Sequence, residues 1–231
     1  MRRFLVALLV AGMVGIRDYH VLADADAPSQ PSQSFQSSFF SLDSSDSNDF
    51  QFSNGGQRPN AERLRIPENT PTPLEGFRWK KKNITIYMET ADPKLKWAFR
   101  DAVKKWNKTK AVHIRWTKNE DKANIIAADG DLARNNTGNN GVGYTTSELG
   151  STRTEYDPTT NTLHKATSTL DPNQLDYTNK EFRSEVAQHE LGHALGLAHA
   201  PEYEHSVMIP RNIKNGITKN DAKTLRMLYR E

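Results

Sequence analysis

Apolar and polar residues alternate over positions 84–88, which is the two-residue period of a strand with one buried face. Asp92-Pro93 follows and provides a helix N-cap with proline at the first helical position. Apolar residues then recur at helical spacing over 95–106, so that one face of the segment is apolar. These patterns predict a strand near 84–88 and an amphipathic helix that begins at Pro93.

Two further strands are predicted before residue 130. Residues 112–116 alternate again, and residues 123–128 form a nearly continuous apolar run, as expected for a strand covered on both faces. The order strand, helix, strand, strand predicts a mixed sheet with a right-handed crossover helix packed on it.

The middle of the chain has weaker patterns. Residues 129–141 are rich in Gly, Asn and Asp and are interpreted as a loop, and a second loop is expected over 150–161. Between and after these loops we expect a short edge strand at 142–146 and a returning strand at 162–170.

Two capping boxes mark helix starts in the last third of the chain. Thr178-x-x-Glu181 predicts the start of a long helix, and Thr218-x-x-Asp221 predicts the start of a final one. The final helix carries apolar residues that would close the core.

The N-terminus has the features of an export signal. Arg2 and Arg3 precede an uncharged, mostly apolar run over 4–16, and small residues at Ala25 and Ala27 offer cleavage sites. The apolar run is shorter than the about 20 residues that a membrane-spanning helix needs. We therefore expect a signal peptide at 1–27, no membrane span, and a secreted, extracellular protein, with association to the cell surface left open.

The segment that follows has low complexity. Ten of the 33 residues at 28–60 are serine, mixed with Gln, Asn, Asp and Pro. Such a composition cannot bury enough apolar surface to offset its ordering entropy. We interpret 28–72 as a disordered Ser-rich linker, or alternatively as a pro-segment, and expect the folded domain over 73–231.

Composition excludes several kinds of chemistry. The chain has no cysteine, so it has no disulfide framework, no thiolate nucleophile and no cysteine-ligated zinc. Residues 61–231 carry 27 Lys and Arg against 22 Asp and Glu, a net of +5. That charge permits attraction to an anionic surface or an acidic peptide, and we expect no nucleic-acid partner.

Residues 189–199 read HELGHALGLAH and hold the chain's clearest chemical motif. His189 and His193 are four positions apart, so on a helix they lie on one face, one turn apart. Phe182 and Val186 continue this stripe toward the N-terminus, which supports the helix independently of the histidines. Two imidazoles placed in this way can bind one zinc ion at about 2.0–2.1 Å each.

The rest of the motif completes a catalytic site. Gly196 tolerates the positive φ of a sharp turn, after which the chain can return and place His199 on the same ion. Three histidines leave one coordination position open for water, whose pKa zinc lowers toward ~7. Glu190 can take the proton of that water as a general base. The alternative is a helix whose histidines are satisfied or exposed and bind no metal.

The extended motif resembles that of the metzincin clan of zinc peptidases. A second clan feature, a methionine turn after the third histidine, is matched by Ser206-Val207-Met208-Ile209-Pro210. This turn most resembles the matrixins, the family that includes matrix metalloproteinases and smaller bacterial relatives, and the lack of cysteine favours a bacterial type.

The resemblance implies a metzincin-like zincin fold of the α/β (α+β) class. It implies a mixed twisted sheet of about five strands with an active-site helix, a crossover helix and a C-terminal helix. Met208 would form an apolar floor beneath one catalytic zinc, and a peptide substrate would pair with the edge strand around 141–146. We expect a monomer.

Three features depart from the matrixin pattern. Ala200 follows the third histidine, where matrixins usually have serine, and His164 stands alone where animal matrixins hold a second zinc. The cysteine switch that keeps animal matrixins latent cannot exist here. The loop after Asp129 has the oxygen-rich composition that calcium prefers, although a solvated turn is the favoured interpretation.

These residues predict a secreted zinc-dependent endopeptidase that acts on peptide or protein substrates, with Glu190 activating the zinc-bound water. Two other functions stay open on sequence grounds. One is a non-catalytic zinc-binding module that holds a peptide, although such a module has no need of Glu190. The other is a dedicated processing enzyme with a single partner, which would show a narrow cleavage pattern.

Overall fold

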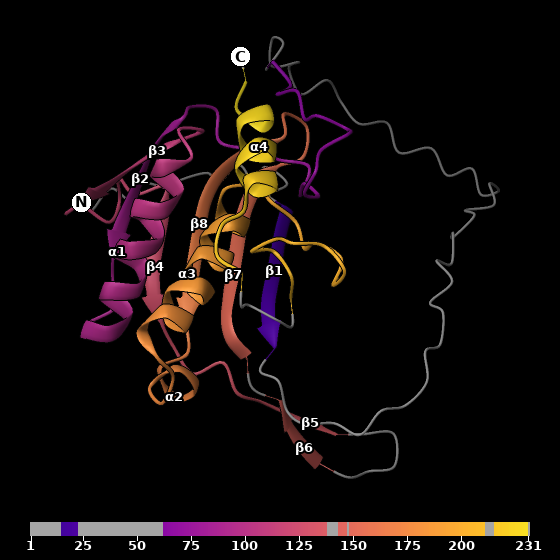
Figure 1. The fold of residues 1–231 in the computed structure, drawn as a ribbon. Helices are drawn as coiled ribbons and strands as arrows, with labels where there is room; N and C mark the ends of the chain where they lie inside the picture. Colours follow the sequence, from indigo (N-terminus) through magenta and orange to yellow (C-terminus); the bar gives the residue numbers. More distant parts are fainter. Residues whose placement is uncertain (1–14, 23–61, 138–142, 147, 211–214, 231) are drawn as a thin grey trace, which may run out of the picture. The chain divides into compact units, whose positions relative to one another are not determined.

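The computed structural model describes residues 15–22, 62–137, 143–146, 148–210 and 215–230. Within these residues six strands form the main sheet (Figure 1), in the order β1 (Gly15–Leu22), β7 (Glu148–Asp157), β8 (Thr162–Leu170), β4 (Ile125–Asp129), β2 (Asn83–Met88) and β3 (His113–Thr117). The pairs from β8 to β3 are parallel, whereas β7 is antiparallel to both of its neighbours. The predicted mixed sheet of the α/β class is confirmed.

Two long helices lie side by side on one face of this sheet (Figure 1): α1 (Pro93–Lys108), which connects the parallel strands β2 and β3, and α3 (Lys180–Ala194). A shorter helix, α4 (Lys219–Leu228), carries the end of the chain. Among the described residues, no helix is long and apolar enough to cross a membrane.

Helix α3 is held in place through its backbone. Three buried aromatic side chains donate hydrogen bonds to carbonyls of α3 or its C-cap: Trp106 to Gln188 (3.0 Å), Trp79 to Ala194 (2.8 Å) and Tyr229 to Leu195 (3.1 Å). The donors come from α1, from the segment before β2 and from the end of α4. The position of α3 is therefore fixed by three separate parts of the core.

The predicted helix starts are confirmed at two of three helices. Asp92 caps α1 with proline next to it, and Thr218 with Asp221 forms a capping box at α4. At α3 the prediction was wrong by one residue, since Asn179 is the N-cap and accepts a hydrogen bond from the Phe182 backbone. The Thr178 hydroxyl instead donates to Leu175, at the end of a short helix α2 (Pro172–Leu175) that the sequence patterns did not predict.

The loop predicted over 150–161 is wrong in most of its length, because β7 runs from Glu148 to Asp157. Its inward positions include Gly150, Thr152 and Thr154, all buried, while Arg153 between them is exposed. The two-residue period is therefore present. Small and hydroxyl-bearing residues carry it in place of large apolar ones, so a search for apolar alternation does not find the strand.

The edge of the main sheet also differs from expectation. Gly143–Thr146 (β6) is a strand, as predicted, but it pairs with Arg134–Thr137 (β5) in a separate two-stranded ribbon. That ribbon lies partly in a segment predicted to be a loop. The position beside β7 is taken by the backbone of β1, within the predicted signal peptide at 1–27, whose cleavage stays a prediction.

Gly196 is the glycine for which the fold requires the absence of a side chain most clearly. Its φ is +96°, and an added Cβ would lie 2.5 Å from the Phe77 carbonyl oxygen. Gly76 has a similar φ of +91°, but an added Cβ there would meet nothing within 4 Å. A side chain at Gly76 would therefore cause backbone strain alone, whereas a side chain at Gly196 would cause backbone strain and steric overlap.

We predict that Gly196→Ala lowers the free energy of unfolding by more than Gly76→Ala does. The positive φ should cost each variant about 1–2 kcal/mol, and the overlap with Phe77 should add about 1–3 kcal/mol at Gly196 alone. Urea denaturation of both variants measures the difference. Equal losses would show that the turn after α3 can shift to accept a side chain.

Candidate metal centre

Three imidazoles converge at the C-terminal end of α3. His189 and His193 are fully buried on the helix, and His199 follows the turn after it. Each of the three offers a ligand nitrogen, and these atoms all lie within 4.8 Å of one another. The Nε2 atoms of His189 and His193 are 3.1 Å apart. Among the described residues this is the group of three or more potential ligands that could hold a metal ion.

The turn that returns His199 to the helix depends on Gly196. After this residue the Leu197 amide donates back to Gly192, and Leu197 forms an antiparallel bridge with Leu74. These hydrogen bonds direct the chain back along the end of α3, as the sequence predicts from the glycine alone.

Backbone carbonyls fix the protonation of the two helical histidines. His189 Nδ1 donates to the Val207 carbonyl at 2.7 Å, and His193 Nδ1 donates to the Leu197 carbonyl at 3.0 Å. When each ring is neutral its proton therefore sits on Nδ1, which leaves Nε2 as the lone-pair atom for a metal. Burial, followed by the neighbouring His193 and His199, holds the pKa of His189 well below its ordinary value, so it is neutral.

The two carboxyl oxygens of Glu190 have different surroundings. Its Oε2 accepts a hydrogen bond from the Thr152 hydroxyl at 2.6 Å, whereas its Oε1 is buried without a hydrogen-bond partner among the described residues. Burial raises the pKa of Glu190 well above its ordinary value, and the nearby Glu148 adds to this, while the Thr152 hydrogen bond opposes it.

This donor set fits zinc. Three neutral imidazoles are the ligands of a catalytic zinc site, and three protein ligands leave a coordination position for water. A buried carboxylate oxygen with no protein partner among the described residues, one position after His189, is suited to bind that water. The residues present therefore fit the metal that the motif predicts.

Comparison with known proteins agrees with this chemistry. The matrixin family model matches residues 78–230, about two thirds of the chain. The chain belongs to the matrixin family. It is a zinc metalloendopeptidase, as the motif and the methionine turn predicted.

Solved structures and curated proteins add little to the family match. Two structures of myroilysin are similar to this matrixin, with 10% identity, a TM-score of 0.43 and coverage of 69% of this chain and 98% of that chain in one case. The other has 12% identity, a TM-score of 0.41 and coverage of 75% and 93%. A search of curated proteins found no match.

Met208 packs under the active-site helix of this matrixin. The side chain is fully buried, and its sulfur lies 2.3 Å from the place where a Cβ on Gly192 would stand. Gly192 lies between the two helical histidines, so its lack of a side chain is what admits the thioether. The expected apolar floor thus packs directly against the backbone of α3.

Asp221 links the methionine turn to α4. Its carboxylate is fully buried and accepts hydrogen bonds from the Val207 amide (3.0 Å), the Thr72 hydroxyl (2.8 Å), the Thr218 amide (2.9 Å) and the Ser206 hydroxyl. Since the Val207 carbonyl accepts from His189, one buried carboxylate holds the residue that orients the first predicted ligand. The sequence patterns identified Asp221 only as part of a capping box.

Two further residues at the site were missed by the sequence patterns. Thr152 lies in the segment predicted to be a loop, so its bond to Glu190 had no signal in the sequence. Glu75 is buried with Oε1 3.3 Å from His193 Nδ1, and it stands in an irregular segment where no period marks it. Both reach the site through long-range packing.

The oxygen-rich loop after Asp129 is interpreted from the sequence as a solvated turn in preference to a calcium site. The loop after Asp129, which ends β4, contains Asp131, whose carboxylate accepts a hydrogen bond from the Ala133 amide. This is a turn stabilised by its own aspartate, in line with the interpretation as a solvated turn.

We predict that Asp221→Asn weakens both the fold and the hold on zinc. An amide in place of the carboxylate turns a donor toward groups that are themselves donors, which should cost about 2–3 kcal/mol of unfolding free energy. Because Val207 then loses its anchor, the zinc dissociation constant should rise by about 10-fold or more. Denaturation of the apoprotein and competition with a zinc-binding dye measure the two effects.

The matched control for this substitution is Asp176→Asn. Asp176 is exposed and pairs with the exposed Lys94, so its loss should change stability by at most about 1 kcal/mol. Unchanged zinc affinity in Asp221→Asn would contradict the positioning of His189 through Val207.

Proposed function

We propose that this matrixin is a secreted endopeptidase in which His189, His193 and His199 hold the zinc and Glu190 carries the proton. The observation that supports this is the convergence of three imidazole nitrogens within 4.8 Å beside a buried carboxyl group. When bound, zinc supplies a Lewis acid that acidifies water and polarises the scissile carbonyl.

In this proposal Glu190 acts first as a general base and then as a general acid. Its Oε1 takes a proton from the attacking water and later delivers it to the nitrogen of the departing amine. Thr152 holds Oε2, so the carboxyl group turns the same oxygen toward the reaction throughout. Burial raises the pKa of Glu190, which favours the protonated form that delivers the proton to the amine.

Gly150 makes room for this carboxyl group. A Cβ added there would lie 2.7 Å from Glu190 Oε1 and 2.8 Å from its Cγ. Strand β7 can therefore pass directly over the general base, which brings the backbone of β7 and the proton carrier together.

We propose that the substrate lies extended along the outer edge of β7. This edge accepts an antiparallel strand, since the backbone of Gly15–Leu22 pairs with it over its length. In that register Val21 is opposite Gly150, and Gly150 abuts Glu190. An extended peptide that pairs with β7 in the same position would therefore lie next to the general base, with its backbone fixed by sheet hydrogen bonds.

In this proposal, removal of the export signal makes the outer edge of β7 available to the substrate. A signal cleaved after Ala25 or Ala27 removes all of β1, and the outer edge of β7 is then free for a substrate. The uncleaved chain would keep that edge occupied by its own backbone. Removal of the signal would thus also free the proposed substrate site.

We predict that Glu190→Ala abolishes turnover while zinc stays bound. Loss of the general base should lower kcat by about 10²–10⁴-fold, because none of the three imidazoles is altered. Casein hydrolysis and zinc content per chain are measured on the same preparation. Glu185→Gln, a partly buried carboxyl on the same helix, is the control and should retain wild-type activity.

Full activity in Glu190→Ala would refute Glu190 as the proton carrier. Loss of zinc together with activity would show that this carboxyl group acts on the metal site itself. Equal zinc content with no hydrolysis by the wild type across a broad peptide library would favour a non-catalytic binding module.

We predict that a chain beginning at Ala27 cleaves peptides faster than a chain that retains residues 15–26. Removing β1 leaves unpaired amide and carbonyl groups along β7, so KM should fall with little change in kcat. Steady-state kinetics on both chains with one fluorogenic peptide measure KM and kcat separately. An identical KM would place the substrate somewhere other than the outer edge of β7.

A further inference from the structure

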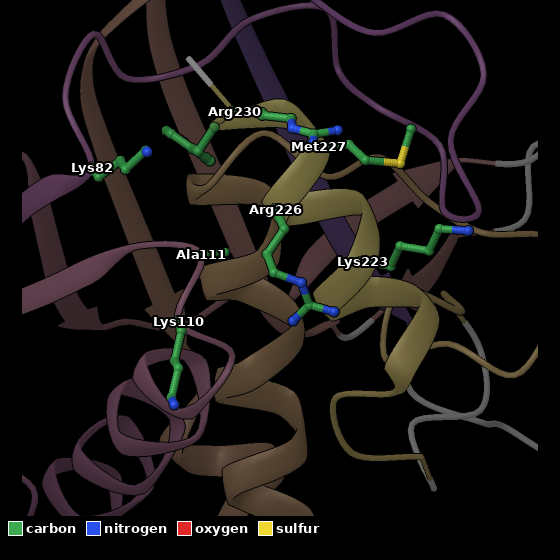
Figure 2. Close-up of a pocket in the computed structure, with 8 residues that line it drawn as sticks. Lys82, Lys110, Ala111, Lys223, Arg226, Met227 and Arg230 are labelled. Atoms are coloured by element: carbon green, nitrogen blue, oxygen red, sulfur yellow. The ribbon is translucent and has the colours of Figure 1, made fainter.

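A hollow of about 570 Å³ lies beside α4 and is lined by five cationic side chains (Figure 2). Lys82 comes from the segment before β2 and Lys110 from the turn between α1 and β3, while α4 and its end supply Lys223, Arg226 and Arg230. All five side chains are exposed. Segments far apart in the sequence thus bring charge of one sign to one concave place.

A second hollow of about 460 Å³ shares Arg226 with the first. It adds Lys105, Lys108 and Lys219, and no acidic side chain lines either hollow among the residues the structure describes. We call the two hollows together the basic groove. Its eight cationic side chains and their single sign of charge distinguish it from a pocket for one small ion.

Most of this charge forms no ion pair within the part of the chain that the structure describes. Lys105 pairs with Asp101 at 2.9 Å, but the other seven cations of the basic groove form no ion pair with any other residue in the described part of the chain. The net charge of the whole chain is only +3, so the groove concentrates charge that is balanced elsewhere. The guanidinium group of Arg226 is also held in position, because its Nη1 donates to the Thr109 carbonyl at 3.0 Å.

The lining of the basic groove indicates which anion it fits. Its one aromatic residue, Tyr229, is buried with its hydroxyl donating to Leu195, so among the described residues no ring is offered for stacking with nucleobases. The exposed large hydrophobic residues of the described chain lie outside the groove, so none of them is placed to enter a bilayer there. What remains is a row of ammonium and guanidinium groups along a concave path.

We propose that the basic groove binds a flexible linear polyanion that carries closely spaced phosphate or sulfate groups. Neither the three histidines nor Glu190 lines the groove, so a polymer held there leaves the metal centre accessible. Bound in this way, the enzyme would be retained on a polyanionic surface polymer while it cleaves nearby proteins. This site is independent of the peptidase chemistry proposed above.

The test measures binding of long-chain inorganic polyphosphate and of dextran sulfate to the full chain. The double variant Lys82→Gln with Lys223→Gln removes two cations from the groove. Removing each cation should weaken binding about tenfold at about 50 mM salt and reduce the slope of log K against log salt by about 0.7–0.9. The variant should therefore bind about a hundredfold more weakly, with unchanged peptide hydrolysis and Tm.

A control with the same change in net charge is Lys118→Gln with Lys122→Gln, two exposed lysines outside both hollows. It should bind like the wild type. Wild-type binding of polyphosphate alone, dextran sulfate alone or both would support the groove and identify its oxyanion. Equal losses in the two double variants, binding of neither polymer, or binding only to phosphatidylserine vesicles would overturn it.

Discussion

The structure depends on bringing three imidazoles together at the C-terminal end of α3. His189 and His193 achieve this by their four-residue spacing on α3, and His199 by the turn at Gly196. Packing alone would not orient the two helical rings, because each must also keep its proton on Nδ1. The carbonyls of Val207 and Leu197 supply that orientation by accepting from these rings.

The supports of this site reach far into the core. Trp79, Trp106 and Tyr229 donate to carbonyls of α3 and its C-cap, so the helix that carries two of the proposed ligands cannot rotate without breaking buried hydrogen bonds. Asp221, at the start of α4, holds the methionine turn through buried hydrogen bonds of the same kind. Burial that makes His189 neutral also raises the pKa of Glu190, so one environment acts on both the proposed zinc ligand and the proposed general base.

The sequence predicts those parts of the site that one helix and one turn contain. The spacing of His189 and His193 and the glycine at 196 are local, so their consequence can be read without a tertiary structure. Thr152 could not be found in this way, because its strand alternates in threonine and glycine and resembles a loop. Glu75 and Asp221 bind groups 118 and 14 residues away from them, a pairing that no local period encodes.

The most direct test of the central claim is X-ray absorption at the zinc K-edge of the chain loaded with one zinc ion. The account predicts three imidazole nitrogens at about 2.0–2.1 Å and one further light atom from solvent. Replacing His199 by alanine should remove one imidazole from that shell and leave the other two. A wild-type shell with only two imidazoles, or one closed by a protein carboxylate, would contradict the account.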